Sequence, residues 1–287
     1  MIKRSLSMAL SIALAILMST VTAAPSAKLW PKWEAHDNSS TLVIDHRRWN
    51  DLLGHYIVRG DDALNRFAYS NVTPADRSNL QKYLATLAAV TISDYNRNEQ
   101  RAYWINLYNA LTIEEILKAY PLKSIRDISS GFFSSGPWGL ELIIVEGKTL
   151  TLDDIEHRIL RPIWKDPRIH YALNCASIGC PDLQPTAYSA LNTKALLERG
   201  AVDFINHPRG AQVVVGKLQT SSIYRWFEAD FGGNDRGVIA HLRQYASDAL
   251  KKSLSSIDSI SNHAYDWRLN GLSGSEFSDS LNRGKDG

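Results

Sequence analysis

Cys175 and Cys180 are the residues of this sequence best suited to nucleophilic chemistry. They lie in a turn rich in small residues that follows residues 168–174, where we expect a strand. Backbone N–H groups that converge on such a turn favour a thiolate, which is the nucleophilic form of cysteine. The pattern therefore predicts a nucleophile at Cys175, with Asn174 and Ser177 as neighbouring binding groups.

Two histidines are candidates for the base that takes up the thiol proton. His170 lies on the expected strand, and His157 follows Glu156 on a helix expected over residues 151–160, which opens with a capping box. Adjacent helical residues point about 100° apart, so we expect Glu156 to orient another group, such as His170 or a backbone N–H. We predict that all three side chains converge with Cys175 on one pocket, because a shared network satisfies buried polar groups together.

Two other roles for the cysteines remain open at this point. In an oxidising compartment Cys175 and Cys180 could form a disulfide, although so short a loop would contribute only about 2 kcal/mol to stability. A zinc site is the other possibility, with His157 and His170 as further ligands, but the C-x₄-C spacing is looser than in common zinc motifs. The residues themselves do not decide between these roles.

The longest periodic segment, residues 98–119, carries two asparagines among apolar residues. Asn106 and Asn109 are three positions apart and therefore share one helix face. A buried amide without partners costs roughly 1–3 kcal/mol, so both should have specific partners. They could form a polar wall or oxyanion donors beside Cys175. We favour the alternative, in which they fix a neighbouring loop to the core.

Residues 265–270 alternate aromatic and polar side chains near the end of the chain. Tyr265 and Trp267 suit a docking segment that inserts into the body of the protein, and for Asp266 we favour a surface salt bridge over the role of an orienting acid. A second aromatic segment lies in the Gly/Ser/Pro-rich loop over residues 130–139, which could dock a ligand or a partner.

Four segments resemble the family called "domain of unknown function 547", and the chain is similar to an exported bacterial member. The matching stretches, in chain order, are residues 103–112, 152–161, 170–183 and 265–270. The resemblance implies that the family's Glu-His pair corresponds to Glu156 and His157, and that its His and two Cys correspond to His170, Cys175 and Cys180.

The resemblance also bears on the role of the cysteines. Similar domains occur in proteins without secretion signals, where reducing conditions disfavour structural disulfides. A motif that keeps both cysteines there favours a reactive thiol or a metal site. Ile178 departs from the polar or small residue that many members have in this turn.

The remaining pattern predicts an α+β fold, with one helix-rich domain around a small antiparallel sheet. Helix-type spacing covers residues 49–58, 74–88, 98–119, 151–160, 187–206, 223–227 and 238–250. Strand-type patterns cover residues 142–145, 168–174, 212–215 and 217–220. Because helices outnumber strands and do not alternate regularly with them, a doubly wound sheet is disfavoured. We expect the domain over residues 24–270 and a disordered tail over 271–287.

The first 23 residues have the three parts of a secretory signal peptide. Lys3 and Arg4 give a basic start, an apolar run covers residues 8–18, and small residues precede the expected cleavage after Ala23. Loss of those two cations takes the formal net charge from +2 to zero. We therefore expect an exported protein, periplasmic or extracellular, with no nucleic-acid partner and no transmembrane segment in the mature chain.

These observations favour an uncharacterised exported thiol enzyme, a hydrolase or acyltransferase that acts on an amide or ester and needs no cofactor. The alternatives are a non-catalytic envelope module that binds a small-molecule or peptide-like ligand, and a Cys/His zinc protein. The sequence has no G-x-S-x-G elbow, P-loop, dinucleotide fingerprint or H-E-x-x-H motif, so the enzyme classes that use them are disfavoured.

Overall fold

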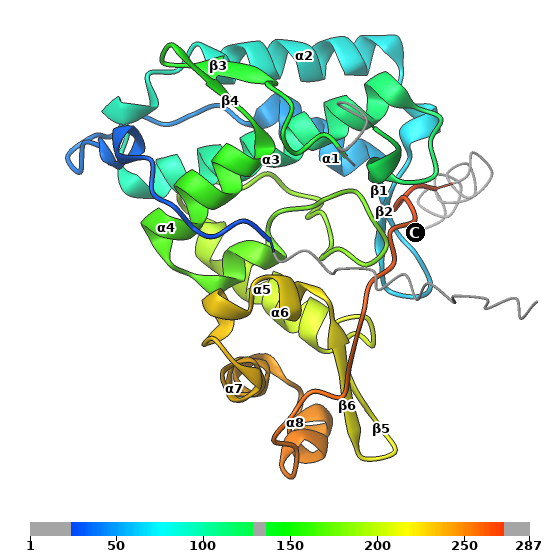
Figure 1. The fold of residues 1–287 in the computed structure, drawn as a ribbon. Coiled ribbons are helices and arrows are strands. Elements are labelled where there is room, and N and C mark those ends of the chain that lie inside the picture. The colour runs from blue at the N-terminus through cyan, green and yellow to red at the C-terminus, as the bar shows by residue number, and fades with distance from the viewer. Residues whose placement is uncertain (1–23, 129–135, 273–287) are drawn as a thin grey trace, which may run out of the picture.

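The computed structural model describes residues 24–128 and 136–272, whose arrangement is shown in Figure 1. The α-helices are α1 (Arg47–Tyr56), α2 (Pro74–Ala88), α3 (Arg97–Ala119), α4 (Arg161–Trp164), α5 (Thr193–Ile205), α6 (Ile223–Trp226), α7 (Asp235–Tyr245) and α8 (Asp248–Leu254). The strands are β1 (Ile57–Arg59), β2 (Asn65–Phe67), β3 (Ile143–Val145), β4 (Lys148–Leu150), β5 (Ala211–Val214), β6 (Lys217–Ser221) and β7 (Asn262–Ala264). Three helical turns that matter for the site are the π-helix η5 (Asp154–Leu160) and the 3₁₀-helices η6 (Pro167–Tyr171) and η7 (Glu228–Phe231).

Helix α3 forms the centre of the larger apolar core. The Asn96 side chain caps its start by accepting hydrogen bonds from the backbone N–H groups of Asn98 and Glu99. Nearly every residue from there to Leu117 is buried, so α3 is enclosed on all sides. Helices α2 and α5 and the π-helix η5 pack against it, and α1 and β3 pack against α2 (Figure 1).

A second, smaller apolar cluster lies among α5, α6 and α7. Helix α5 connects the two clusters, because Leu197 packs in the larger one and Phe204 packs in the smaller one. The residues of η6 and the turn after it, which carry His170 and the cysteines, therefore lie where the two clusters meet.

The structure confirms the α+β class and corrects the expected single sheet. In the described part of the chain the strands form three small sheets, β1–β2, β3–β4 and β5–β6–β7. The first two are antiparallel hairpins, and in the third β7 joins β6 in parallel. Each strand has only three to five residues. Each hairpin therefore pairs its own backbone hydrogen-bonding groups locally and does not extend a common sheet.

Some predicted elements are wrong in type or in extent. The strand expected over residues 168–174 is the 3₁₀-helix η6, because Pro167 starts a helical turn and the Asp166 side chain caps it through Arg168 N–H. The helix expected over residues 187–206 begins only at Thr193. The segment over residues 238–250 is divided between α7 and α8, with Ser247 as the N-cap of the second helix.

Several expectations lie outside the described residues. They are the leader over residues 1–23, the aromatic positions Phe132 and Phe133, and the part of the tail beyond residue 272. Within residues 24–128 and 136–272, no helix is both long enough and apolar enough to cross a membrane.

Candidate functional site

The turn that carries the cysteines is closed by the side chain of Asn174. Its amide oxygen accepts a hydrogen bond from Ala176 N–H at 2.9 Å, and its amide nitrogen donates to Pro181 O at 2.8 Å. Asn109 on α3 fixes the start of the turn by accepting from Asn174 N–H and donating to Ala172 O, both at 2.9 Å. Asn106 holds the backbone of Tyr188 in the same way.

These contacts give both asparagines of α3 the loop-fixing role that we favoured. In each of them the amide nitrogen donates to a backbone carbonyl and the amide oxygen accepts from a backbone N–H. Asn174 makes the same two kinds of bond inside the turn. The structure therefore brings Asn109 and Asn174 to the cysteine turn as structural supports, whereas Asn106 supports a different loop.

The C-terminal segment covers the cysteine turn on its outer side. Ile178 N–H donates to Arg268 O and Gly179 N–H donates to Asp266 O, each at 2.8 Å. Gly179 is required at this approach, because a Cβ there would lie 2.6 Å from the backbone nitrogen of Asp266. The segment then pairs with Phe67 in β2, so it runs from β7 past the turn to the first sheet (Figure 1).

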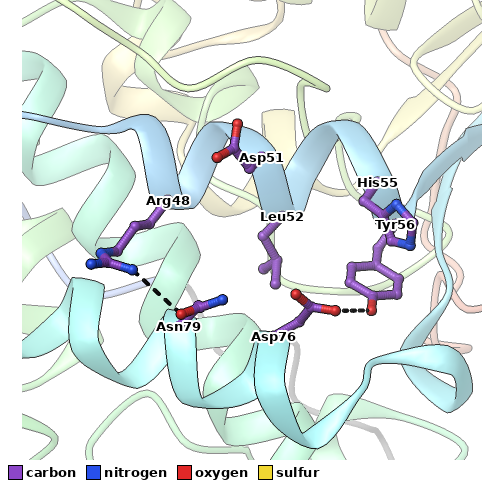
Figure 2. A pocket seen from close by; sticks show the side chains of 7 residues that line it. All are labelled: Arg48, Asp51, Leu52, His55, Tyr56, Asp76 and Asn79. Carbon is purple, nitrogen blue, oxygen red and sulfur yellow. Dashed lines mark hydrogen bonds between the residues drawn. The ribbon is translucent and has the colours of Figure 1, made fainter.

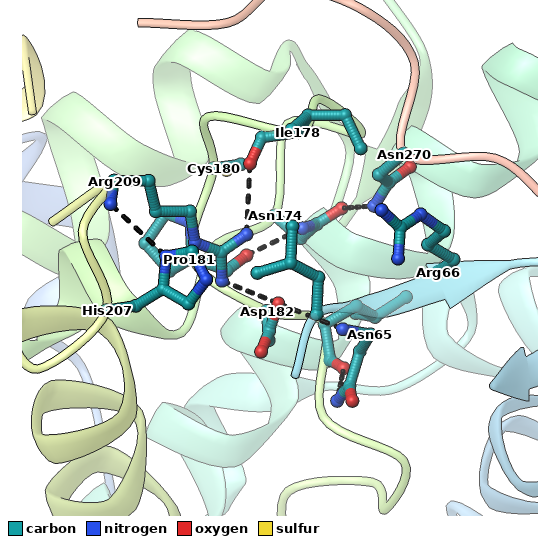
Figure 3. A network of polar contacts seen from close by, with 12 residues as sticks. Asn65, Arg66, Asn174, Ile178, Cys180, Pro181, Asp182, His207, Arg209 and Asn270 are labelled. Carbon is teal, nitrogen blue, oxygen red and sulfur yellow. Dashed lines mark hydrogen bonds and ion pairs between the residues drawn. The ribbon is translucent and has the colours of Figure 1, made fainter. Parts of the chain in front are cut away.

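A charged side chain supports the turn from a third direction. Arg209 donates to Ile178 O at 2.9 Å and to the Asp182 carboxylate at 2.6 Å, and Asp182 also accepts from Asn65 N–H (Figure 3). Since Arg209 and Asp182 are both largely buried, this ion pair fixes the end of the turn to β2 and to the loop after α5.

Cys175 and Cys180 are free thiols in this structure, so the disulfide that was one of the open possibilities is not formed here. Their sulfur atoms lie 3.0 Å apart, which is about 1 Å beyond the length of an S–S bond. Cys175 N–H also donates to the Cys180 sulfur at 3.0 Å. Cys175 is half-buried, whereas Cys180 is only 3% exposed.

The Cys175 sulfur has three hydrogen-bonding neighbours. They are the Cys180 thiol, the Ser177 hydroxyl at 3.3 Å and the Tyr265 hydroxyl at 2.8 Å. The hydrogen bond from Cys180 does most to lower the pKa of Cys175, and it acts with the two hydroxyls against burial, which raises it. Burial raises the pKa of Cys180 and of Tyr265, so both hold their protons more firmly than Cys175 does. Of the two thiols, Cys175 therefore loses its proton more readily.

A charged cluster connects η5, α4, η6 and η7. Asp230 accepts from His170 Nε2 at 2.7 Å and from Arg161 Nε at 2.6 Å, and Glu156 lies 3.5 Å from His170 Nδ1. Arg161 also contacts Nδ1 of His157 at 3.0 Å. Three of the four predicted catalytic residues, Glu156, His157 and His170, thus lie in one network with Arg161 and Asp230.

The ionisation of this cluster follows from its contacts. Burial opposes a charged His170, but the Asp230 and Glu156 carboxylates outweigh burial and hold the pKa of His170 above its usual value. Burial likewise opposes a charged Glu156, and His157, His170 and Arg161 hold the pKa of Glu156 below its usual value. The pKa of Asp230 is also lowered, because His170 and Arg161 outweigh its burial.

The local backbone explains why an N-terminal segment covers this cluster. Pro162 has no N–H, so the carbonyls of His157 and Arg158, five and four residues before it, lack a helical donor at that position. Lys28 N–H and Trp30 N–H donate to these two carbonyls at 2.9 and 3.0 Å.

The thiol and the charged cluster are electrostatically coupled. The negative charge of Glu156 raises the pKa of Cys175, in opposition to the hydrogen bonds from Cys180, Ser177 and Tyr265. Among the described residues, the hydrogen bonds of the Cys175 sulfur go to these three side chains and to neither histidine. The full convergence on one pocket therefore stays a prediction.

The pockets at the surface of the described residues include two of similar volume. One, of about 300 Å³, is bounded by Ile178, Gly179, the Tyr265 side chain and Arg209, so it adjoins the cysteine turn. The other, of about 290 Å³, lies between α1 and α2 (Figure 2) and contains none of the predicted site residues.

Sequence reasoning missed three residues that complete the site. Tyr265 was expected to dock, but its hydroxyl at Cys175 was not anticipated, and the partners Arg161 and Asp230 were not singled out. Arg161 and Tyr265 both lie in segments that resemble the family, and that resemblance was the available signal. In the described parts of the chain, no group of three or more His, Cys, Asp or Glu side chains is arranged to hold a metal ion.

Comparison with known proteins identifies a family for the central part of the chain. Residues 92–205 match the family model described as "Protein of unknown function, DUF547". No curated protein and no solved structure matches the chain. The matched segment contains α3, the Glu156–His157 pair, His170 and the cysteine turn. Residues 92–205 of this chain are therefore similar to the DUF547 family, whose function is unknown.

Proposed function

We propose that the chain is a thiol-dependent hydrolase or acyltransferase in which Cys175 is the nucleophile. The observation that carries the proposal is the short contact from the Tyr265 hydroxyl to the Cys175 sulfur at 2.8 Å. A donor at that distance stabilises the thiolate, and Cys175 is half-buried, whereas its partner Cys180 is buried.

The proposed reaction uses each group of the site in a definite role. The Cys175 thiolate attacks the carbonyl carbon of an ester or amide and forms a tetrahedral oxyanion. Collapse breaks the bond to the leaving group, which takes up a proton from water and departs as the alcohol or amine, and a thioester remains on Cys175. Attack by water or by an acceptor on this thioester completes hydrolysis or transfer and releases the thiolate. Tyr265 and Ser177 hold the thiolate between turnovers.

Of the two histidines, His157 is the one we assign as the proton acceptor. Both ring nitrogens of His170 face carboxylates, which favours the imidazolium and makes it a fixed positive charge. His157 differs in that its Nδ1 contacts the Arg161 guanidinium at 3.0 Å, which favours an unprotonated Nδ1, while its Nε2 lies 3.4 Å from the Asp153 carboxylate. Glu156 lies between the two rings, 4.0 Å from His157 Nδ1 and 3.5 Å from His170 Nδ1, and orients them.

The test uses p-nitrophenyl acetate, an activated ester that needs no specific binding. We expect a burst of p-nitrophenolate and an acetyl group on the peptide that contains Cys175, located by mass spectrometry. Cys175→Ser should abolish both signals, and Cys180→Ser should retain the acetyl adduct. An equal burst from Cys175→Ser, or no adduct on Cys175, would favour the non-catalytic binding module instead.

We also propose export, on the basis of Lys3, Arg4 and the apolar run that follows them. The intact mass of protein recovered from the periplasm or medium should correspond to cleavage near Ala23. A chain that still carries Met1 in that fraction would contradict this proposal.

A further inference from the structure

The two sulfur atoms of the cysteine turn are already placed for bond formation. They lie 3.0 Å apart without a covalent bond, and closing to a disulfide requires a movement of about 1 Å. The backbone around them is fixed, since Cys175 N–H donates to the Cys180 sulfur and Cys180 N–H donates to Ser177 O. Two thiols that are held this close form a disulfide with each other more readily than two thiols that must first meet by diffusion.

The two thiols also differ in access to solvent. Cys175 is half-buried, whereas Cys180 is 3% exposed and its side chain approaches the Leu173 carbonyl at 3.6 Å. Cys175 is therefore the more accessible residue of the pair for an incoming reagent, and Cys180 is its buried neighbour. This is the arrangement of an attacking thiol with a resolving thiol.

We infer that Cys175 and Cys180 form a redox-active pair that reduces low-molecular-weight disulfides and is itself converted to a reversible disulfide. This inference goes beyond the proposed acyl chemistry and does not require it. One consequence does rest on the proposed function: the oxidised pair has no thiolate, so oxidation would switch the nucleophile off.

The reaction balances in two steps. The Cys175 thiolate attacks one sulfur of the external disulfide R–S–S–R, forms the mixed disulfide Cys175–S–S–R and expels R–S⁻. Cys180 then loses its proton to the expelled thiolate and attacks the Cys175 sulfur, which expels the second R–S⁻. Two electrons pass from the dithiol to the external disulfide, which leaves as one thiol and one thiolate.

The surroundings of Cys175 provide an optical signal for this step. Tyr265, whose hydroxyl contacts the thiolate, packs against Trp226 and Trp267 with ring centroids 4.8 and 4.5 Å away. Conversion of the thiolate to a disulfide removes the acceptor of the Tyr265 hydrogen bond. We therefore expect oxidation to change the fluorescence of the neighbouring tryptophans.

The test treats the full, reduced chain with mixtures of reduced and oxidised glutathione in the absence of oxygen. We expect a disulfide between Cys175 and Cys180, detected as the loss of two hydrogens from their common peptide and reversed by excess reduced glutathione. Cys180→Ser should accumulate glutathione on Cys175, because the resolving thiol is missing. Cys175→Ser should react at least about tenfold more slowly, since only the buried thiol remains.

Three outcomes would overturn the inference. They are the absence of the intramolecular bond at every glutathione ratio, no adduct on Cys175 in Cys180→Ser, and equal reaction rates for the two serine variants. The ester experiment is independent of all three, because acetylation of Cys175 needs no oxidant. Failure of the redox pair is therefore distinguishable from failure of the proposed enzyme function.

Discussion

The Tyr265 hydroxyl lies 2.8 Å from the Cys175 sulfur, although the two residues are 90 positions apart in the chain. A hydrogen bond to a charged group contributes about 1.5–3 kcal/mol. We predict that Tyr265→Phe raises the pKa of Cys175 and slows its alkylation by iodoacetamide at pH 7 roughly tenfold.

The pH dependence of the alkylation rate measures this effect. In Tyr265→Phe the rate should rise at higher pH than in the wild type, while the plateau at high pH is retained. Tyr95→Phe removes a hydroxyl from a half-buried tyrosine outside the cysteine turn and serves as the control. Superimposable profiles for Tyr265→Phe and the wild type would show that the tyrosine does not stabilise the thiolate.

Gly179→Ala should separate the C-terminal segment from the cysteine turn. The new Cβ would meet the Asp266 nitrogen at 2.6 Å and its carbonyl oxygen at 3.1 Å, and both are backbone atoms that cannot rotate away. We expect a loss of about 1–3 kcal/mol in the free energy of unfolding, measured by urea denaturation, and faster alkylation of Cys180.

The matched control for that variant is Gly54→Ala. Gly54 lies inside α1, and a methyl group added there would have no neighbouring atom within 4 Å. Alanine at this position should therefore be neutral or stabilising by up to about 1 kcal/mol. Equal effects of the two substitutions would contradict a specific contact at Gly179.

Asn109→Ala and Asn106→Ala should differ in their effect on the thiols. Both remove a buried amide with two backbone partners, so each should cost about 2–5 kcal/mol of stability. Of the two, it is Asn109 that supports the cysteine turn, because its partners are Ala172 O and Asn174 N–H.

The alkylation rate of Cys175 separates the two variants. It is measured on folded protein, at a urea concentration that lies the same interval below the unfolding midpoint of each variant. It should change in Asn109→Ala and stay at the wild-type value in Asn106→Ala. A change of the same size in both would mean that the thiol responds to general loss of stability.

The charged cluster should make stability depend on pH on both sides of a maximum. The pKa of His170 is raised by carboxylates that outweigh burial, so its contribution is complete below about pH 6.5 and is lost as the pH rises through the higher folded value. The pKa values of Glu156 and Asp230 are lowered, so their contributions are present above about pH 4.5 and are lost as the pH falls through the folded values.

Asp230→Asn tests this assignment. It removes the charge that pairs with His170 and Arg161 and should cost about 3 kcal/mol or more near pH 6. The loss of stability at alkaline pH should begin at lower pH than in the wild type, because the pKa of His170 is no longer raised by Asp230. Asp258→Asn changes an exposed carboxylate and is the control. Parallel urea-derived stability curves for Asp230→Asn and the wild type from pH 5 to 9 would refute the role of Asp230.

The helices that the sequence predicts best have both an N-cap residue and apolar residues at clear helical spacing. Thr73 caps α2 by accepting from Asp76 N–H, as its position before Pro74 indicates. The Thr151–Asp154 capping box is present, with each side chain accepting from the backbone of the other. Caps are local, so their geometry depends on residues that the sequence places side by side.

The parts that the sequence does not reveal depend on distant partners. Apolar residues on alternate positions suggested a strand over residues 168–174, but Asp166 and Pro167 start a helical turn there. Asp230 reaches Arg161 across 69 positions, and Tyr265 reaches Cys175 across 90. Neither pairing has a sequence pattern of its own, because only the packing of several elements brings these side chains together.

The cover that the C-terminal segment forms over Gly179 also bears on the order of events during synthesis. A chain that leaves the ribosome or an export channel with its N-terminus first can form α3 and the cysteine turn before residues 265–270 are available. Until that last segment docks, the Cys175 sulfur lacks the Tyr265 hydroxyl, and both thiols are more open to cellular reagents. Maturation of the thiol is thus a late, non-local folding event, and chains that end before Tyr265 should keep an ordinary cysteine at position 175.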